Sequence, residues 1–531
     1  MDLNTILRLL VTISCFSLIV RVIVSRNHWG WLGVSIGILG VMGIALYWIP
    51  EQAGIIGGIL WLILILIPLI GLRQVNRLVY QEQFQKARRL ASILSWLHPA
   101  DGWRERPRFL KVLELTKKGE IETAKTKLSP YVRSPQHSFD YTAKALQFRL
   151  ECRWEDCLHW LQTDISHALL WQNSTLVTVY LRALGEVGDV NGLIWTVKSH
   201  QSQINRLGDS ILINLARLYV FAFSGEVQEV QKLFTSTLNI YPKNIQTFWL
   251  ATAEMALGNQ ENGHRLLLSI QEKDVSLESA IAQRFSQPIP QADQILTVTS
   301  QRILHTIKQD LQQEINYGSA ISITPTKAYF TYSLMVANVL VFLLEMQAGG
   351  TQNLETLYRL GAAVPVEIFS GEPWRILTAN FLHYGYIHIG SNLLGLWILG
   401  PYVEFYLGWI RYLIVYFISG LGAISLFAVF AMFLGEGDEL LVGASAAIMG
   451  LMGATFMILW RGWRQEQSTI AQERLRLVIL IISLQIMFDV SLAKVSFIGH
   501  FCGLIFGIFS TFIILAINKN KMGIVNKNNL R

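Results

Sequence analysis

The stretch LLVGASAAIMGLMGATFMILW, residues 440–460, is apolar and about as long as the roughly 20 residues that a membrane-spanning helix needs. Near its start, Ser445 stands between Ala444 and Ala446, whose side chains are too small to crowd a hydroxyl. A polar side chain inside a membrane span costs free energy, and it normally faces a bundle interior or serves a function. Ser445 is therefore the first candidate for a functional residue.

The composition of the whole chain indicates an integral membrane protein. Of the 531 residues, 52% are hydrophobic and 15% are charged, whereas about a quarter of the residues of a soluble protein are charged. The formal net charge is +7, but the Lys and Arg residues gather beside apolar runs, as cytoplasmic loops require. We therefore expect contact with membrane lipid and no nucleic-acid partner.

Three apolar runs open the chain, at residues 6–24, 31–49 and 53–72. No small-residue cleavage site follows the first run, so we expect a membrane span there rather than a signal peptide. Basic residues follow the third run, and the positive-inside rule places such a segment in the cytoplasm. The sequence thus predicts three transmembrane helices in residues 1–72 and a basic cytoplasmic linker helix in residues 73–104.

A turn-like pattern recurs between residues 105 and 322, in steps of 33, 36, 37 and 33 residues. Its first positions are Gly119, Cys152, Gly188, Gly225 and Gly258. The period is similar to the 34-residue helix-turn-helix unit of tetratricopeptide (TPR) repeats. We therefore expect a cytoplasmic, TPR-like α-solenoid. Its concave surface would bind a cytoplasmic protein or peptide, or the domain would act only as a spacer; the sequence leaves both readings open.

The segment Ile323–Thr326 contains Pro325 and marks a boundary, because proline is disfavoured inside helices. Apolar runs fill the rest of the chain, and Lys and Arg residues gather at every second loop between them. The loops after the first, third and fifth of these runs lack that excess and are expected to face outward. The predicted fold is an all-α membrane protein with a six-helix bundle in residues 323–520 and a cytoplasmic tail in residues 521–531. Six further apolar runs, of which the fifth is short, cover residues 329–346, 377–399, 412–434, 440–460, 475–488 and 497–517.

Under this topology the second, fourth and sixth helices of the bundle begin at the outer face. The second helix carries His383, His388 and Asn392, and the sixth carries His500. At 100° per residue, His388 and Asn392 share one face of a helix, whereas His383 and His388 are 140° apart. Two histidines so far apart cannot aim at one metal ion, so we expect no metal and no other cofactor.

These side chains suit acyl transfer. The hydroxyl of Ser445 is a weak nucleophile alone, and His500 is the expected general base that removes its proton. The side chains of His388 and Asn392, with the backbone N–H of Ser445, are expected to hold the oxyanion. The sequence shows no intramembrane carboxylate near His500, so we expect a Ser–His dyad rather than a triad.

Glycines recur on several of the apolar runs, and small residues let membrane helices approach closely. A close approach of two helices would bring a serine on one to a histidine on the other. Plain helix packing explains the same spacing equally well. The glycines in question are Gly33, Gly37, Gly40 and Gly43 in the second run, Gly443, Gly450 and Gly453 near Ser445, and Gly499, Gly503 and Gly507 near His500.

Over residues 325–520 the chain resembles the rhomboid family of intramembrane serine proteases. The resemblance is carried by the order and spacing of four motifs: Gly371-Glu-Pro-Trp374-Arg375-Ile-Leu-Thr, His383-x4-His388-x3-Asn392, Gly443-Ala-Ser445 and Gly499-His500-x-x-Gly503.

The resemblance implies a role for each matching residue. Ser445 would be the nucleophile, His500 the base, and His388 and Asn392 the oxyanion donors. The other matching residues would support the site: Gly443 and Gly503 by close helix packing, Trp374 and Arg375 by bracing the active site from a loop partly in the outer leaflet, Glu404 as a structural carboxylate, and His383 as a further supporting residue.

Two residues depart from the family pattern. Ala446 stands where glycine usually follows the serine, and Met449 stands where an aromatic residue often packs on the histidine. Neither change removes a catalytic group, but both bear on rate and substrate range.

The sequence therefore predicts a serine endopeptidase that cleaves the transmembrane helices of single-pass membrane proteins. The expected location is a bacterial cytoplasmic membrane, with the active site near the outer face. The alternative is a catalytically inactive rhomboid-like adaptor that recruits partners through the TPR-like domain. A transporter fits less well, because the spans contain no acidic relay and no pair of similarly broken helices.

Overall fold

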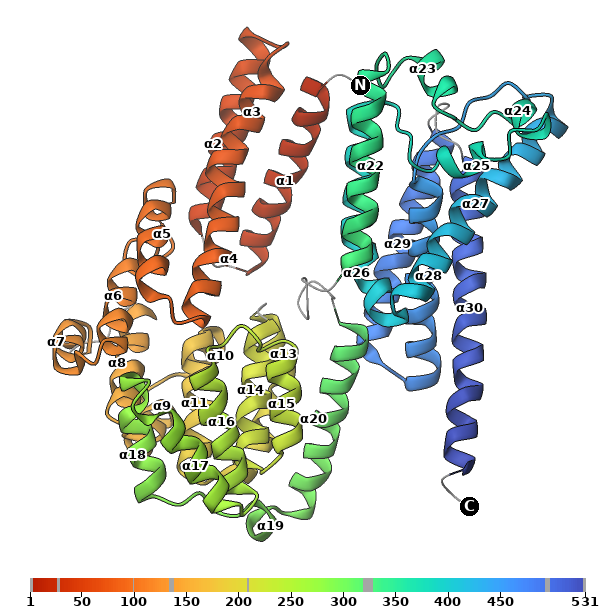
Figure 1. Cartoon of the computed structure of the whole chain (residues 1–531). Helices are drawn as coiled ribbons and strands as arrows, with labels where there is room; N and C mark the ends of the chain where they lie inside the picture. The colour runs from red at the N-terminus through yellow and green to blue at the C-terminus, as the bar shows by residue number, and fades with distance from the viewer. Residues whose placement is uncertain are drawn as a thin grey trace. The chain divides into compact units, whose positions relative to one another are not determined.

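The computed structural model is helical throughout most of the chain, which confirms the predicted all-α fold class (Figure 1). Within the described ranges, extended backbone pairs only at one antiparallel bridge, between Ala363 and Leu441. The chain divides into two compact units, Met1–Ile307 and Lys308–Arg531. The structure describes residues 3–25, 29–98, 100–132, 138–207, 210–318, 328–491 and 497–528.

The first unit begins with three apolar helical rods, as the sequence predicts. Each is long and apolar enough to cross a membrane. Near the start of the first, the Asn4 side-chain oxygen accepts a hydrogen bond of 2.6 Å from the backbone N–H of Gly54, which fastens the first rod to the third. The rods are α1 (Leu3–Ser25), α2 (Trp29–Trp48) and the continuous run of α3 (Ala53–Trp61), the π-helical turn η1 (Leu62–Leu66) and α4 (Ile67–Tyr80).

The small-residue face of α2 does not make the helix contacts that its sequence predicts. A Cβ atom added to any of its four glycines would meet nothing within 4 Å in the described chain. The helix buries the opposite side instead, through Trp31, Ile38 and Met42. Large apolar side chains pack more surface than a glycine stripe does, so they decide which side of α2 faces its neighbours.

Helix α5 (Phe84–Leu97) follows α4 and lies in the predicted linker. Five helical pairs come next, and each turn residue that the recurring pattern marks has a positive φ: Gly119, Cys152, Gly188, Gly225 and Gly258. A left-handed residue just past the end of a helix is the usual way to stop it, and glycine adopts that conformation without strain. The pairs are α6 (Arg106–Lys117) with α7 (Ile121–Val132), α8 (Ser138–Leu150) with α9 (Trp154–Thr163), α11 (Ser174–Glu186) with α12 (Val190–Ser199), α14 (Ser210–Phe223) with α15 (Val227–Thr235), and α16 (Lys243–Ala256) with α17 (Gln260–Gln271).

Shorter helices fill the spaces between and after these pairs, and the long helix α20 ends the repeat region. The likeness to TPR repeats stays a prediction. The remaining helices are α10 (His167–Gln172), α13 (Gln201–Arg206), η2 (Val275–Leu277), α18 (Glu278–Ser286), α19 (Ala292–Ile295) and α20 (Val298–Tyr317).

Cys152 is the one non-glycine residue among these five turns, with φ of 53°. We expect Cys152→Gly to stabilise the protein by about 0.5–1 kcal/mol, because relief of left-handed strain outweighs the greater freedom of glycine in the unfolded chain. The midpoint of thermal unfolding of the full-length protein in detergent measures the effect. The reverse change at an equivalent turn, Gly258→Ala, should lower the midpoint, since an added Cβ has room there but φ is +100°. A lower midpoint for Cys152→Gly would contradict this reading.

Six long helices build the second unit, as predicted (Figure 1). Three short helices, α23 (Leu354–Arg359), α24 (Pro365–Phe369) and α25 (Arg375–Thr378), lie in the connection after the first long helix. The long helices are α22 (Tyr329–Gln347), α26 (Gly385–Leu407), α27 (Trp409–Leu434), α28 (Ser445–Glu466), α29 (Thr469–Ser491) and α30 (Phe497–Asn528).

For three of these helices the bounds predicted from the apolar runs are wrong. The second and fourth helices start later than their apolar runs, at Gly385 and Ser445. The fifth is not short, because α29 has 23 residues and includes the charged side chains of Glu473, Arg474 and Asp489. Apolar composition marks where a chain can meet lipid, whereas helix ends are set by backbone hydrogen bonds, so the two need not coincide.

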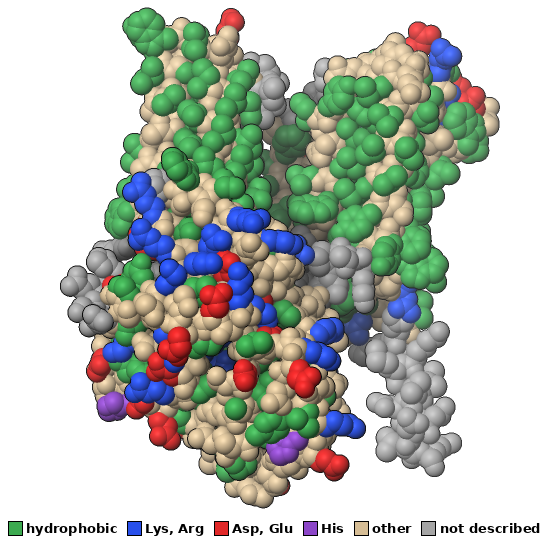
Figure 2. Space-filling view, turned by 60° about the vertical axis from the view of Figure 1, so that its left-hand side comes forward, with side chains coloured by type: hydrophobic (Ala, Val, Ile, Leu, Met, Phe, Trp, Pro, Cys, Tyr) green, Lys and Arg blue, Asp and Glu red, His purple; other side chains and the backbone are tan. Residues whose placement is uncertain are grey.

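Helix α28 is the centre of the second unit. Of its apolar span, 72% is buried, against 28% for α22, 44% for α27 and 33% for α30. On the face shown in Figure 2, apolar side chains cover the long helices of each unit, whereas charged side chains gather over the helical pairs. An apolar exterior over long helices is what a lipid environment requires.

In all, seven described helices or rods are long and apolar enough to cross a membrane. Helices α26 and α29 are 23 residues long but are not among these seven. The predicted boundary at Ile323–Thr326 lies outside the described residues, and the predicted tail of residues 521–531 is helical as far as Asn528.

Candidate active site

Ser445 is the first residue of α28, so its backbone N–H has no acceptor within the helix. The segment that leads to it is fixed on both sides. Leu441 exchanges two backbone hydrogen bonds with Ala363, and the N–H of Gly443 donates to the carbonyl of Ala379 at 2.8 Å. The sequence therefore places a partly exposed hydroxyl at a helix N-terminus, on a segment held by the loop before α26.

Gly443 brings two predicted site residues to this segment. An added Cβ would lie 2.7 Å from both Cε1 and Nε2 of the His388 ring and 3.6 Å from Nδ2 of Asn392, so no larger residue fits. Its φ of +124° also favours glycine. His388 and Asn392 thus share one face of α26, as their spacing predicts, and that face meets the chain two residues before Ser445.

Both side chains offer hydrogen-bond donors there. The backbone N–H of Tyr384 donates to Nδ1 of His388 at 3.3 Å, so the neutral ring carries its hydrogen on Nε2, one of the two ring atoms that face Gly443. Asn392 is 7% exposed, and among the described residues its Nδ2 has no acceptor. A buried amide without a partner is costly, and an anion bound beside Gly443 would satisfy it.

Helices α28 and α30 touch along their glycines. An added Cβ on Gly503 would overlap the carbonyl of Ala446, and one on Gly507 would overlap the backbone of Gly450. Both contacts have the same offset in sequence, so the two helices run parallel. His500, one turn before Gly503, therefore lies at the level of the segment that carries Ser445.

The structure brings Ser445 and His500 to the same end of two touching helices without joining them directly. Among the described residues, no hydrogen bond links the Ser445 hydroxyl to the His500 ring. His500 is close enough to His388, the ring that lies against Gly443, for a charge on one ring to act on the other. Catalytic hydrogen bonds are often long in an enzyme without substrate and tighten when it binds.

The prediction that no carboxylate lies near His500 is wrong. Oδ2 of Asp489 is 2.8 Å from Nδ1 of His500, and the Asp489 side chain is 2% exposed. Because α29 continues to Ser491, Asp489 is a helix residue rather than part of the outer loop to which the sequence assigned it. The signal was present in the sequence as an acidic residue directly after an apolar run.

A second correction concerns His383. It precedes α26, which begins at Gly385, so the 140° separation from His388 on one helix does not apply. His383 is fully buried, and its ring packs edge-on against the His388 ring at 5.2 Å. Its backbone N–H donates to Glu345 at 2.9 Å, and Nδ1 donates to the carbonyl of Phe381 at 3.0 Å. His383 therefore supports the ring of His388 from behind.

The comparisons with known proteins agree with this geometry. A family model for the rhomboid domain matches residues 370–517. The chain is 34% identical over 200 residues to the rhomboid protease GluP of Bacillus subtilis, covering 38% of this chain and 37% of that protein. It is 31% identical over 160 residues to the rhomboid protein YdcA of the same bacterium, covering 30% of this chain and 72% of YdcA.

The chain belongs to the rhomboid family. RHOMBOID-like protein 5 of Arabidopsis thaliana is a further relative, 32% identical over 163 residues, which are 31% of this chain and 51% of that protein. The chain thus spans only about a third to a half of the length of GluP and the Arabidopsis protein. Together with the seven candidate spans, the rhomboid domain identifies an integral multi-pass membrane protein.

Within this rhomboid domain, Arg375 organises the connection between α22 and α26. Its guanidinium donates to the carbonyls of Tyr358 at 2.7 Å and Ala362 at 3.1 Å, and pairs with Glu372. It also lies over the ring of Trp374, 4.9 Å from the centroid. Ala363, in the same connection and next to Ala362, pairs with Leu441 on the Ser445 segment, so Arg375 holds the backbone that contacts this segment.

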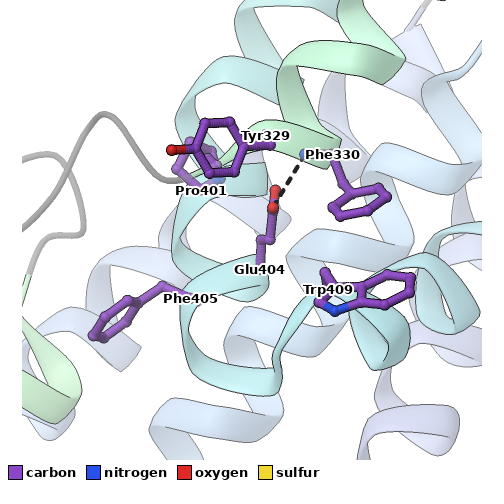
Figure 3. Close-up of a pocket in the computed structure, with 7 residues that line it drawn as sticks. Tyr329, Phe330, Pro401, Glu404, Phe405 and Trp409 are labelled. Atoms are coloured by element: carbon purple, nitrogen blue, oxygen red, sulfur yellow. Dashed lines mark hydrogen bonds between the residues drawn. The ribbon is translucent and has the colours of Figure 1, made fainter.

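Glu404 lies at the other end of the rhomboid domain. Its carboxylate accepts a hydrogen bond of 3.1 Å from the backbone N–H of Phe330 (Figure 3). It also accepts one of 2.8 Å from the N–H of Thr331, and both residues lie in the first turn of α22. A carboxylate at a helix N-terminus stabilises the helix dipole. Along α26 it lies roughly 24 Å from His388, at 1.5 Å per residue, so it is too far away to take part in chemistry there. A cavity of about 160 Å³ beside it is lined by Ala328, Tyr329, Phe330, Pro401, Glu404, Phe405 and Trp409.

The two departures from the family pattern are both buried on α28. Ala446 is 5% exposed and Met449 is 8% exposed. The Ala446 carbonyl faces Gly503, so the backbone contact between α28 and α30 forms with alanine at this position. Their influence on rate stays a prediction.

Proposed function

We propose that this rhomboid is an intramembrane serine endopeptidase that cleaves single-pass membrane proteins, with Ser445 as nucleophile and His500 as general base. The observation that carries the proposal is the cluster of hydrogen-bond donors beside Gly443. The N-terminus of α28, the Nε2 hydrogen of His388 and the unpartnered amide of Asn392 meet at Gly443. The names of several relatives, which include proteases, support the same reaction class.

The proposed reaction has two halves. Oγ of Ser445 bonds to the carbonyl carbon of the substrate, its proton moves to Nε2 of His500, and the carbonyl electron pair shifts onto oxygen. The resulting oxyanion accepts hydrogen bonds from His388, Asn392 and the N–H of Ser445. The carbon–nitrogen bond then breaks as His500 returns the proton to the leaving nitrogen. In the second half, water gives a proton to the same imidazole and adds to the acyl carbon. The bond from that carbon to Oγ then breaks, and Oγ takes the proton back from His500.

The backbone of a membrane helix is fully hydrogen-bonded, so a substrate must unwind before its carbonyl can reach Ser445. We therefore propose that substrates carry helix-weakening residues such as Gly, Ala, Ser or Pro near the outer leaflet. A panel of purified single-pass reporters in vesicles, with and without such residues, tests the proposal. Cleavage within or near the weakened helix is expected. No cleavage of any reporter, together with no labelling of Ser445 by a fluorophosphonate, would favour the adaptor alternative.

Asn392→Ala should lower kcat by about 10²-fold, because one oxyanion donor of this kind is worth about that much. KM should change less than about threefold, since the bond strengthens only in the transition state. Asn338→Ala is the matched control, because Asn338 is also a buried membrane-helix asparagine whose Nδ2 already donates to the carbonyl of Leu334. Cleavage rates of a reporter measure both. A kcat within twofold of wild type for Asn392→Ala would remove this residue from the oxyanion site.

The charge distribution supports the orientation we propose. Basic residues follow α4 and border α29, so the positive-inside rule places the repeat region and those ends in the cytoplasm and the Ser445 end at the outer face. We also propose the domain bounds given above. The proposed partner of the repeat region is a cytoplasmic protein or peptide. A bacterial cytoplasmic membrane is the simplest setting.

A further inference from the structure

Asp489 has hydrogen-bond partners for both of its carboxylate oxygens. Oδ2 lies 2.8 Å from Nδ1 of His500, and Oδ1 accepts a hydrogen bond of 2.7 Å from the side-chain amide of Gln485, one turn earlier on α29. The Asp489 side chain is 2% exposed and that of His500 is 14% exposed. Burying a carboxylate costs free energy unless the group is paired and hydrogen-bonded. The two hydrogen bonds therefore hold Asp489, His500 and Gln485 in place relative to one another.

We propose that Asp489 is a positioning residue for His500, holding the ring in the tautomer that leaves Nε2 free to accept the proton of Ser445. A carboxylate can only accept, so Nδ1 of His500 carries the hydrogen of this bond. The proposal rests on the proposed function, because it gives His500 the role of base.

The chemistry of the three groups explains why the contact matters. Neutral imidazole has one hydrogen, and binding it at Nδ1 makes Nε2 the acceptor, which is the state that a general base needs. When the ring takes the proton of Ser445, the carboxylate stabilises the imidazolium without accepting a proton itself. A charge on His388 would repel an imidazolium at His500. Asp489 opposes that repulsion.

The substitution Asp489→Asn tests the proposal. Asparagine keeps the shape and can still accept from Gln485, but it presents an N–H to Nδ1 and so favours the tautomer with the hydrogen on Nε2. By analogy with serine-protease triads, kcat should fall by about 10³- to 10⁴-fold. KM should stay within about twofold, and the midpoint of thermal unfolding should change little. Glu473→Gln, an exposed residue of the same helix with the same change of charge, should leave kcat unchanged.

The failure of this inference is distinguishable from failure of the proposed function. If wild type does not react with a fluorophosphonate at Ser445, the proposed function itself is contradicted, whatever Asp489 does. If wild type reacts and folded Asp489→Asn reacts and cleaves at a rate within threefold of it, only the role of Asp489 is overturned.

Two further variants keep the test decisive if Asp489→Asn does not fold. Gln485→Leu retains the carboxylate but removes the donor that orients it, and kcat should fall about tenfold with KM unchanged. Asp489→Ala leaves a space that formate can enter, and added formate should restore activity at least tenfold. Wild-type kcat in Gln485→Leu, or no restoration by formate in folded Asp489→Ala, would overturn the proposal.

Discussion

His500→Ala is expected to lower the rate of reporter cleavage by at least about 10³-fold, with the protein still folded. Without the imidazole, the hydroxyl of Ser445 keeps its proton at neutral pH and is a poor nucleophile. In serine proteases, loss of the base costs about as much as loss of the whole catalytic group, because the residues act as a unit. Ser445→Ala should therefore have an equal effect, and the double variant should be no worse than either single one.

The control for this prediction is His305→Ala. His305 is an exposed histidine of α20, so its removal changes the same chemical group far along the chain from Ser445. Its cleavage rate should match wild type. The cleavage rates of both variants are measured with a reporter in vesicles and divided by the amount of folded protein, which size-exclusion chromatography gives. A His500→Ala rate within tenfold of wild type would show that another group is the base.

The second large effect is expected at the contact between α28 and α30. Gly507→Val places two methyl groups and a Cβ where the backbone of Gly450 already lies, so one helix must move. Backbone cannot give way as a flexible side chain can, and overpacking of this kind costs about 3 kcal/mol or more. We expect a midpoint of thermal unfolding lowered by several degrees and no measurable cleavage, since Ser445 and His500 lie on the two separated helices.

Gly40→Val is the matched control for that change. Gly40 is also a membrane-helix glycine, but an added Cβ there would meet nothing within 4 Å. Thermal unfolding and cleavage by this variant should resemble wild type. Equal unfolding midpoints for Gly507→Val and wild type would mean that α28 and α30 do not touch along their glycines.

Residue spacing in the sequence predicts two features of the site. Helical spacing puts His388 and Asn392 on one face, and the structure has both beside Gly443. The glycines of α28 and α30 were expected to let two helices approach, and they do. The first inference depends only on local helix geometry. The second also depends on tertiary packing, because the glycine face of α2 meets nothing within 4 Å in the described chain.

Two of the inferences that failed depend on where helices begin and end. His383 was placed on a regular helix, but the helix starts at Gly385, whose φ is +81°. Hydropathy falls at Asp489 and predicts a loop there, although the helix continues to Ser491. The bridge from Ala363 to Leu441 joins segments far apart in sequence, and no periodic pattern announces such a pairing. Tertiary packing decides all three.

The measurement that tests the central claim most directly is the mapping of a covalent fluorophosphonate adduct by mass spectrometry. In wild type, the adduct is predicted on Ser445, and it should be absent from His500→Ala under the same conditions. An adduct on another residue, or an equal yield at Ser445 with and without the imidazole of His500, would contradict the account.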